Sequence, residues 1–414
     1  MKKLVLFGAG KIGRSFVGQL FAQSGYEVVF IDIDEMVITE LNAKRQYKVV
    51  IKSNSPDQVL LVKNVRGVLG TQKDKVVSEL VSCDLAAVSV GQRGLMAINP
   101  ILARAITERK RIAGNPLDII IAENMRNADE FIFNELSQNV ENDFPLKDWV
   151  GLVETSIGKM VPIMPDEEVQ RDPLLVYAEP YNTLILDKKA FKNPIPEVEG
   201  VAPKDNIKAW VDRKSYIHNF GHAATAYAGH LASTDAVYLS EVLESKAVKK
   251  FVRSAMLQSA NILVQKYRGE FTIEDLTLHI DDLLHRFSNR ALRDTVFRVG
   301  CDLQRKLHRN DRVLSPLLDG IRMNLPENKI MQVFAYGLCF GQKDENGNRI
   351  AGDKHFSKML YTKGLPWVLT NICGLKRDED TQYIQRILAA QWSLSPLKLT
   401  LGNRFAKNNR FQHA

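Results

Sequence analysis

The strongest constraint on the fold is a glycine motif placed directly after a short apolar run at the start of the chain. The run LVLFG leads into GAGKIG at residues 8–13, a helical pattern follows, and a second apolar run, EVVFID, ends at Asp32. This order of strand, tight turn, helix and strand is the context in which GxGxxG indicates a dinucleotide-binding unit. The same glycines interrupt the apolar stretch too early for a secretory leader.

The spacing of the motif predicts the cofactor. The three glycines permit the turn, let the backbone approach a pyrophosphate and let the helix pack on the strand, while the helix N-terminus faces the phosphates. Asp32 follows the motif by about 20 residues, where a carboxylate accepts hydrogen bonds from ribose hydroxyls and repels a 2′-phosphate. We therefore expect NAD. The predicted cofactor-binding residues are Gly8, Ala9, Gly10, Lys11, Ile12, Gly13, Asp32 and, at the end of LAAVSVG, Gly91.

The pattern of apolar runs divides the chain into two domains. LVLFG, EVVFIDID, LAAVSVG and LDIIIAEN alternate with helical patterns, which predicts a mostly parallel, doubly wound α/β Rossmann domain over residues 1–193. The prolines of KNPIPEVEGVAPKDN mark the boundary. Long helical periodicity predicts a mainly α-helical catalytic domain over 194–395, and 396–414 are expected to form a basic tail.

Charge and composition restrict the class of partner. Of 414 residues, 45% are hydrophobic and 25% charged, and no apolar run approaches 18 residues, so we expect a soluble protein that does not enter a membrane. The net charge is +8, but four basic residues lie in the last nineteen and the others are dispersed, which argues against nucleic acid. The charge also suits a small anionic substrate.

Cysteine and histidine spacing gives no sign of a metal site. The four cysteines are far apart, and neither CxxC nor HExxH occurs. We expect reduced thiols, a cytoplasmic location and no metal. No tyrosine has a lysine four residues later, so the proton acceptor of short-chain dehydrogenases is absent as well.

The best candidate for a catalytic segment is RKSYIHNFGHAATAYAGH. With the α-helical period, Lys214, His218, Asn219 and His222 fall within an arc of about 140°, which would present an amine, an amide and an imidazole to a cleft. A solvated helix face with incidental polar residues explains the same periodicity. Periodicity alone leaves both interpretations open.

Lys214, Asn219 and His222 reproduce the Lys-x4-Asn-x2-His motif, and with it the chain resembles the polyol-specific long-chain dehydrogenases. Further segments similar to that family are GAGKIGR, LNAKRQYKV, AENM, RDTVFRVGCDLQRKL and DRVLSPLL. The resemblance covers nearly the whole chain except the basic tail. It implies a metal-independent oxidoreductase in which Lys214 is the general base. Asn124 and Asn219 would stabilise a developing alkoxide, and His222 would orient a substrate hydroxyl.

The resemblance also implies that Arg298 and Lys306 bind substrate, and their charge would help to depress the pKa of Lys214. Without the resemblance, Asn124 is better explained as a cap at the end of a strand, and Arg298 and Lys306 are better explained as part of an exposed basic helix face. One departure concerns Gly158 and Lys159, where the family usually has Asp-Arg before Val-Pro. The missing carboxylate bears on polyol recognition or proton handling.

The function implied is NAD-dependent interconversion of D-mannitol 1-phosphate and D-fructose 6-phosphate. Many members of this family are monomers, and a monomer is what the resemblance leads us to expect. Mannitol 2-dehydrogenases and hexuronate reductases of the family usually have an N-terminal extension before the first strand. This sequence opens directly on that strand, which favours a phosphorylated substrate. The alternatives are a polyol 2-dehydrogenase, a fructuronate or tagaturonate reductase, and a non-enzymatic NAD-binding regulator. A phosphate and a carboxylate are both anions that Arg or Lys holds, so the sequence separates them poorly.

Overall fold

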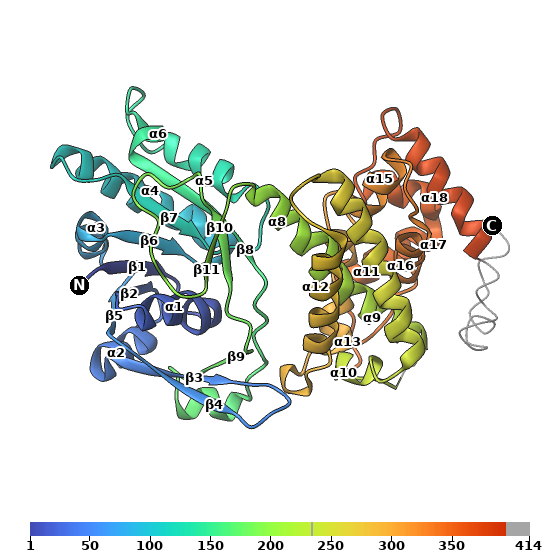
Figure 1. Ribbon diagram of the computed structural model, residues 1–414, viewed down its shortest axis with the longest axis horizontal. Coiled ribbons are helices and arrows are strands. Elements are labelled where there is room, and N and C mark those ends of the chain that lie inside the picture. Colours follow the sequence, from blue (N-terminus) through green and yellow to red (C-terminus); the bar gives the residue numbers. More distant parts are fainter. Residues whose placement is uncertain (233–234, 395–414) are drawn as a thin grey trace. The chain divides into compact units, whose positions relative to one another are not determined.

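The computed structural model describes residues 1–232 and 235–394 (Figure 1). The chain divides into two compact units, Met1–Val211 and Asp212–Ala414, which we call the N-terminal and the C-terminal unit. The predicted basic tail, 396–414, lies outside the described residues. None of the helices in the described ranges has the length and apolar character needed to cross a membrane.

The N-terminal unit is built on an eight-stranded sheet. In spatial order its strands are β11 (Val201–Lys204), β10 (Leu184–Asp187), β8 (Val150–Ile157), β7 (Leu117–Ile121), β6 (Leu85–Val88), β1 (Lys3–Phe7), β2 (Glu27–Asp32) and β5 (Val65–Leu69). Every neighbouring pair is parallel except β8 with β10. The four strands predicted from the sequence are β1, β2, β6 and β7, which confirms the doubly wound α/β prediction.

Alternate side chains of the central strands enter two separate cores. Leu4 and Leu6 of β1 belong to one apolar cluster, and Val5 and Phe7 belong to the other. All four are buried, because helices cover both faces of the sheet. This burial explains why the strands read as continuous apolar runs.

The other elements of this unit are a small sheet and a set of helices. The small sheet has the order β4 (Gln58–Lys63), β3 (Gln46–Ile51) and β9 (Val176–Ala178). The helices are η1 (Gly13–Gly18), α1 (Gln19–Gln23), α2 (Glu35–Lys44), α3 (Lys73–Ser82), α4 (Gly91–Arg111), α5 (Ala128–Ser137), α6 (Leu146–Trp149) and α7 (Asp166–Arg171).

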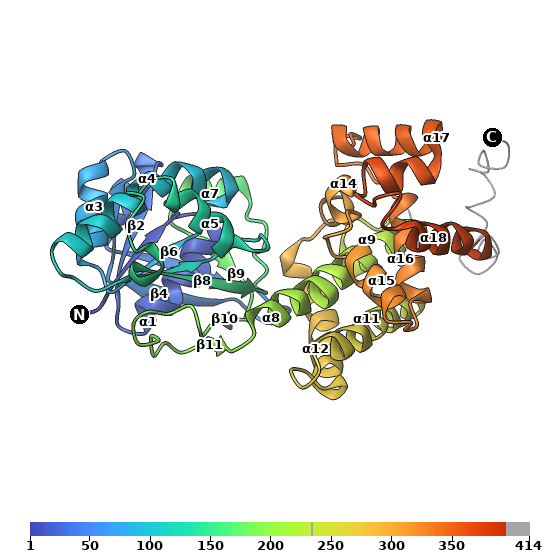
Figure 2. The same ribbon diagram turned by 90° about the horizontal axis from the view of Figure 1, so that it is seen from above.

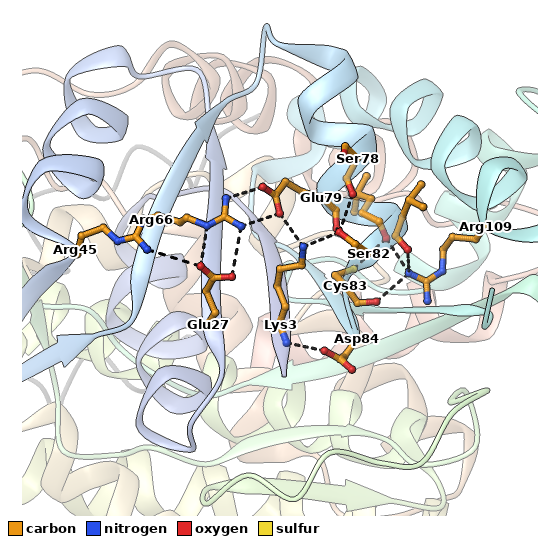
Figure 3. Close-up of polar contacts among 12 residues, drawn as sticks. Lys3, Glu27, Arg45, Arg66, Ser78, Glu79, Ser82, Cys83, Asp84 and Arg109 are labelled. Atoms are coloured by element: carbon orange, nitrogen blue, oxygen red, sulfur yellow. Dashed lines mark hydrogen bonds and ion pairs between the residues drawn. The ribbon is translucent and has the colours of Figure 1, made fainter. Parts of the chain in front are cut away.

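An ion network ties the elements together at the end of the sheet where β1 and β2 begin (Figure 3). Arg66 Nε donates to Glu27 at 2.8 Å, and Arg66 Nη1 donates to Glu79 of α3 at 2.6 Å. Lys3 Nζ reaches the same glutamate at 2.9 Å. The network joins β1, β2, β5 and α3.

The boundary between the units falls at 211/212, within α8 (Ile207–Arg213), and later than the boundary predicted after residue 193. The reason is that the proline-containing stretch folds back onto the sheet. Its residues 201–204 form β11, which pairs only with β10. An edge strand tolerates Pro203, since one side of the strand needs no donor.

The described part of the C-terminal unit is helical, as predicted, with a single β-bridge between Tyr238 and Thr295 (Figure 2). The helices after α8 are η2 (Lys214–Asn219), α9 (Phe220–Ala232), α10 (Leu239–Val242), α11 (Lys246–Lys266), α12 (Ile273–Phe287), η3 (Arg290–Leu292), α13 (Val296–Gly300), α14 (Leu303–Lys306), α15 (Leu314–Arg322), α16 (Asn328–Leu338), α17 (Ala351–Asn371) and α18 (Thr381–Leu394). Helix α9 packs against α11, α13 and α16.

Candidate functional site

The glycine turn after β1 has the backbone geometry that the motif requires. Gly8 has a φ of 97°, and a Cβ atom there would lie 2.1 Å from the carbonyl oxygen of Ser89. A Cβ at Gly13 would lie 2.0 Å from the carbonyl oxygen of Gly8, so the following helix packs directly on the turn. Around Gly10 no protein atom lies within 4 Å of that position, which leaves space for a ligand to approach the backbone.

Asp32 lies at the end of β2 and contacts the same turn. Its Oδ2 accepts from Ala9 N at 2.6 Å, and its Oδ1 accepts from Ile33 N at 2.7 Å and from Asp34 N. The carboxylate is only partly buried, and its oxygens have lone pairs to spare for ribose hydroxyls. These features fit a dinucleotide.

The other predicted cofactor residues differ in their surroundings. Lys11 is exposed, and Ile12 packs against the core beneath the turn. Gly91 begins α4 with a φ of 74°, and its N–H donates to Glu123 Oε1 at 2.9 Å. Val90 N donates to the same oxygen at 2.6 Å, so Glu123 binds the backbone at the start of α4.

The Lys-x4-Asn-x2-His segment begins in a π-helix, η2, rather than in the α-helix that the sequence pattern suggested. In a π-helix residues i and i+5 are hydrogen-bonded neighbours, whereas the α-helical period separates them by about 140°. Lys214 and Asn219 are such a pair, so the π-helix places them on one face. Ser259 of α11 donates to the carbonyl of Tyr216 at 2.7 Å and thereby anchors this turn.

Lys214 lies in an environment that disfavours its charged form. Burial, with Arg312 as the next cause, lowers its pKa to about 8, against an opposing effect of Asp311. The expectation that Arg298 and Lys306 supply this charge is therefore corrected, since the cation acting on Lys214 is Arg312. Arg312 Nε donates to Asp311 Oδ1 at 2.7 Å.

His222, on α9, is held by two groups from outside its own helix. Its ring stacks on Phe287 of α12 with a centroid distance of 4.8 Å and an interplanar angle of 19°. Its Nε2 lies 3.0 Å from Asp294 Oδ2. Burial, together with Arg298 and Lys306, lowers the pKa of His222 well below its ordinary value, which favours the neutral imidazole.

Arg298 and Lys306 have different surroundings. Arg298 lies on α13, has half of its side-chain surface exposed, and pairs with Asp294 through Nη2. Lys306 is buried, its Nζ donates to the carbonyl of Val299 at 2.6 Å, and burial lowers its pKa to about 8. Arg312 thus acts electrostatically on Lys214, His222 and Lys306 within the C-terminal unit, and Arg298 acts on His222.

Asn124 and Lys159, which the family resemblance relates to the substrate, both belong to the N-terminal unit. Asn124 is an exposed residue that follows β7 and precedes α5, and its pairing with Asn219 stays a prediction. Lys159, which replaces the arginine of the family pattern, is buried, and its Nζ donates to Asn182 Oδ1 at 2.8 Å. The same ammonium lies over the ring of Phe16, 5.3 Å from the centroid.

With this geometry described, comparisons with known proteins identify the family. Residues 2–200 match the mannitol dehydrogenase Rossmann domain, and residues 206–365 match the mannitol dehydrogenase C-terminal domain. The chain belongs to the mannitol dehydrogenase family. The resemblance predicted from the motifs is confirmed, and with it the mostly parallel sheet followed by a helical domain.

Solved structures agree with this membership of the mannitol dehydrogenase family. Mannitol 2-dehydrogenase of Pseudomonas fluorescens, in a ternary complex with NAD and D-mannitol, is 14% identical, with a TM-score of 0.72 over 98% of this chain and 94% of that chain. A substrate-free D-sorbitol dehydrogenase is 16% identical, with a TM-score of 0.76 over 94% of this chain and 92% of that one. At such identities the likeness concerns the fold.

Sequence reasoning missed two residues that lie beside the candidate site residues, Asp294 and Arg312. Asp294 lies in RDTVFRVGCDLQRKL and Arg312 in DRVLSPLL, two segments that were recognised as similar to the family. Neither was assigned a role, because only folding places them beside His222 and Lys214. Within the described ranges, no three His, Cys, Asp or Glu side chains gather so as to hold a metal ion.

Proposed function

We propose that this protein is an NAD-dependent dehydrogenase that interconverts D-mannitol 1-phosphate and D-fructose 6-phosphate. The observation that supports an anionic substrate is the group of cations near His222, of which Arg298 keeps half of its side-chain surface exposed. Four cations act on its imidazole, namely Arg298, Lys306, Arg312 and Arg286. The carboxylate in direct contact with it is that of Asp294. A sugar phosphate would pair with the exposed part of the Arg298 guanidinium, whereas a neutral polyol offers it no negative charge.

The N-terminal unit offers the residues that would hold NAD. The open backbone at Gly10 and the N-terminus of η1 would face the pyrophosphate, and Asp32 would bind the ribose. NAD, when bound, supplies the acceptor for the hydride that leaves the carbinol carbon. The resemblance of GAGKIGR to the opening of mannitol-1-phosphate 5-dehydrogenase supports this substrate.

The C-terminal unit supplies the acid–base chemistry. Lys214, with its pKa lowered to about 8, is neutral in a useful fraction of molecules near pH 7 and removes the proton of the reacting hydroxyl. In ketose reduction the ammonium of Lys214 returns that proton. The amide N–H of Asn219 stabilises the developing alkoxide, and Asn124 is assigned the same role. Neutral His222 binds a further hydroxyl, and Arg298 binds the phosphate.

The test is a comparison of substrates under one set of conditions. NADH oxidation is followed with fructose 6-phosphate, fructose, fructuronate and tagaturonate, and NADPH replaces NADH in a parallel series. We expect the highest kcat/KM with fructose 6-phosphate and NADH. Activity on fructose without activity on its phosphate would overturn the proposal.

A hexuronate reductase is the second candidate, and the same positive charge favours it. A carboxylate pairs with a guanidinium in the fork geometry that also holds phosphate. The departure at Gly158 and Lys159 from the family pattern is compatible with a shifted substrate. A preference for fructuronate or tagaturonate in the panel would select this candidate.

A further inference from the structure

Asp294 occupies a buried position between two groups that the proposed function uses separately. It lies between η3 and α13, and 6% of its side-chain surface is exposed. Its backbone is fixed, because its carbonyl accepts from Leu239 N at 2.9 Å and the next residue, Thr295, forms a β-bridge with Tyr238. Thr295 Oγ1 also caps α13 by accepting from Arg298 N at 3.1 Å. The carboxylate therefore has a defined place and direction.

The two oxygens of this carboxylate have different partners. Oδ2 lies 3.0 Å from His222 Nε2, and Oδ1 is paired with Arg298. Phe287 stacks on the imidazole and fixes the plane of the ring, while Asp294 fixes its rotation in that plane. One acidic side chain thus orients both an imidazole and a guanidinium.

The contact with His222 selects a tautomer. An ionised carboxylate only accepts hydrogen bonds, so the ring nitrogen beside it must carry the proton. A neutral imidazole has one N–H, and placing it on Nε2 leaves Nδ1 as an acceptor. The lowered pKa of His222 agrees with a neutral ring. The ring can then accept a hydrogen bond from a substrate hydroxyl but cannot donate one.

The contact with Arg298 leaves most of that guanidinium available for a ligand. Arginine has five N–H donors in a rigid fork, and pairing through Nη2 uses one edge of the fork. Half of the Arg298 side chain is exposed, in contrast to the buried carboxylate. Fixing one edge of the guanidinium orients the others toward an anion.

We propose that Asp294 is a positioning residue that sets the Nε2–H tautomer of His222 and orients Arg298 for an anionic substrate. The proposal rests on the proposed function for its kinetic consequence, but the tautomer is a property of the protein alone. Loss of the carboxylate should weaken substrate binding through two groups at once. NAD binding should be unaffected, since its residues lie in the N-terminal unit.

The spectroscopic test uses the full chain with ¹⁵N-labelled histidine near pH 7.5. Imidazole nitrogen shifts report which nitrogen carries the proton, and the signals of His222 are assigned by their loss in His222→Gln. We expect Nε2–H in the wild type and a mixture of tautomers in Asp294→Asn. The Nδ1–H tautomer in the wild type, or an unchanged tautomer in Asp294→Asn, would refute the proposal. The wild-type measurement suffices if Asp294→Asn fails to fold.

The kinetic test compares Asp294→Asn with Asp380→Asn. Asp380 is a buried carboxylate that pairs with Arg309 in the same unit, as the buried Asp294 pairs with Arg298. We expect Asp294→Asn to raise the KM for the preferred ketose by about tenfold or more, with the KM for NADH unchanged. Asp380→Asn should leave both constants near wild type, and equal effects of the two variants would count against a specific role.

The two proposals fail in different ways. If the wild type turns over none of the four ketoses yet shows the Nε2–H tautomer, the proposed function is wrong and the role of Asp294 in setting the tautomer stands. If fructose 6-phosphate is turned over as expected and the tautomer is Nδ1–H, the proposed function stands and the role of Asp294 is wrong.

Discussion

At the scale of single residues, the site depends on charges that folding brings close together. A lysine normally titrates near 10.4, and at Lys214 burial and Arg312 lower the pKa to about 8. Burial and Arg312 also lower the pKa of Lys306 to about 8. Both amines therefore change their protonation within the range where a dehydrogenase works.

Replacement of Lys214 by alanine should abolish turnover while NAD still binds. Removal of a general base lowers the rate by about 10²- to 10⁴-fold, and η2 contains no second lysine that could replace Lys214. The measurements are kcat for ketose reduction and NADH affinity by fluorescence titration. Unchanged turnover would support the alternative of a non-enzymatic NAD-binding regulator.

The pH profile of polyol oxidation should have an inflection near pH 8, with the rate rising as Lys214 loses its proton. Arg312→Gln removes a cation that lowers this pKa and leaves Asp311 unopposed, so the inflection should move to higher pH. At pH 7 the oxidation rate should fall by about threefold to tenfold. The matched control is Arg309→Gln, because Arg309 pairs with Asp380. A profile of Arg312→Gln that coincides with the control would contradict this explanation.

At the scale of elements, two π-helices carry or adjoin the residues that we propose to be functional. η1 follows the glycine turn, and η2 carries Lys214 and Asn219. A π-helix costs stability relative to an α-helix and is commonly found at functional sites. In η2 it places the amine and the amide on one face, which an α-helix would not do.

Gly10→Ala and Gly13→Ala should separate cofactor binding from packing. A Cβ at Gly13 meets the carbonyl of Gly8 at 2.0 Å, so Gly13→Ala should lower the free energy of unfolding by about 2 kcal/mol or more and weaken NAD binding. A Cβ at Gly10 meets no protein atom within 4 Å, so Gly10→Ala should weaken NAD binding without loss of stability. Thermal unfolding and NADH titration test both variants. Equal loss of stability in the two would refute this assignment.

At the scale of the whole molecule, each of the two compact units carries its own candidate residues. The N-terminal unit holds the glycine turn, and the C-terminal unit holds the groups proposed for acid–base chemistry and anion binding. The fold of the N-terminal unit also depends on the ion network that joins β1, β2, β5 and α3 (Figure 3).

Acid should destabilise the N-terminal unit through Glu79. Arg66 and Lys3 lower the pKa of Glu79 to about 2, whereas an unfolded glutamate titrates near 4.5. This stabilisation is complete above the unfolded pKa and disappears as the pH falls from about 4.5 toward 2. Glu79→Gln should therefore lower stability at pH 7 by about 2 kcal/mol and show a weaker decline in acid. Urea denaturation at pH 7, 5 and 3, with the exposed Glu141→Gln as control, measures this.

The sequence by itself determined the strands β1, β2, β6 and β7 with the fold class, the type of cofactor turn and the family. These depend on local patterns: the apolar runs of β1 and β2, the glycines between them, and the spacing of Lys214, Asn219 and His222. The α-helical period was the wrong geometry for that motif, because the choice of a π-helix depends on packing, including the contact of Ser259 with the Tyr216 carbonyl. The boundary was placed too early, because prolines that break a helix also fit an edge strand.

Only the tertiary structure decided which charges act on the proposed catalytic groups. Asp294 is 72 residues from His222 in the chain, and the two side chains meet at 3.0 Å. Arg312, likewise remote, is the cation that lowers the pKa of Lys214. Such effects depend on distance and burial in three dimensions, and no local pattern encodes either quantity.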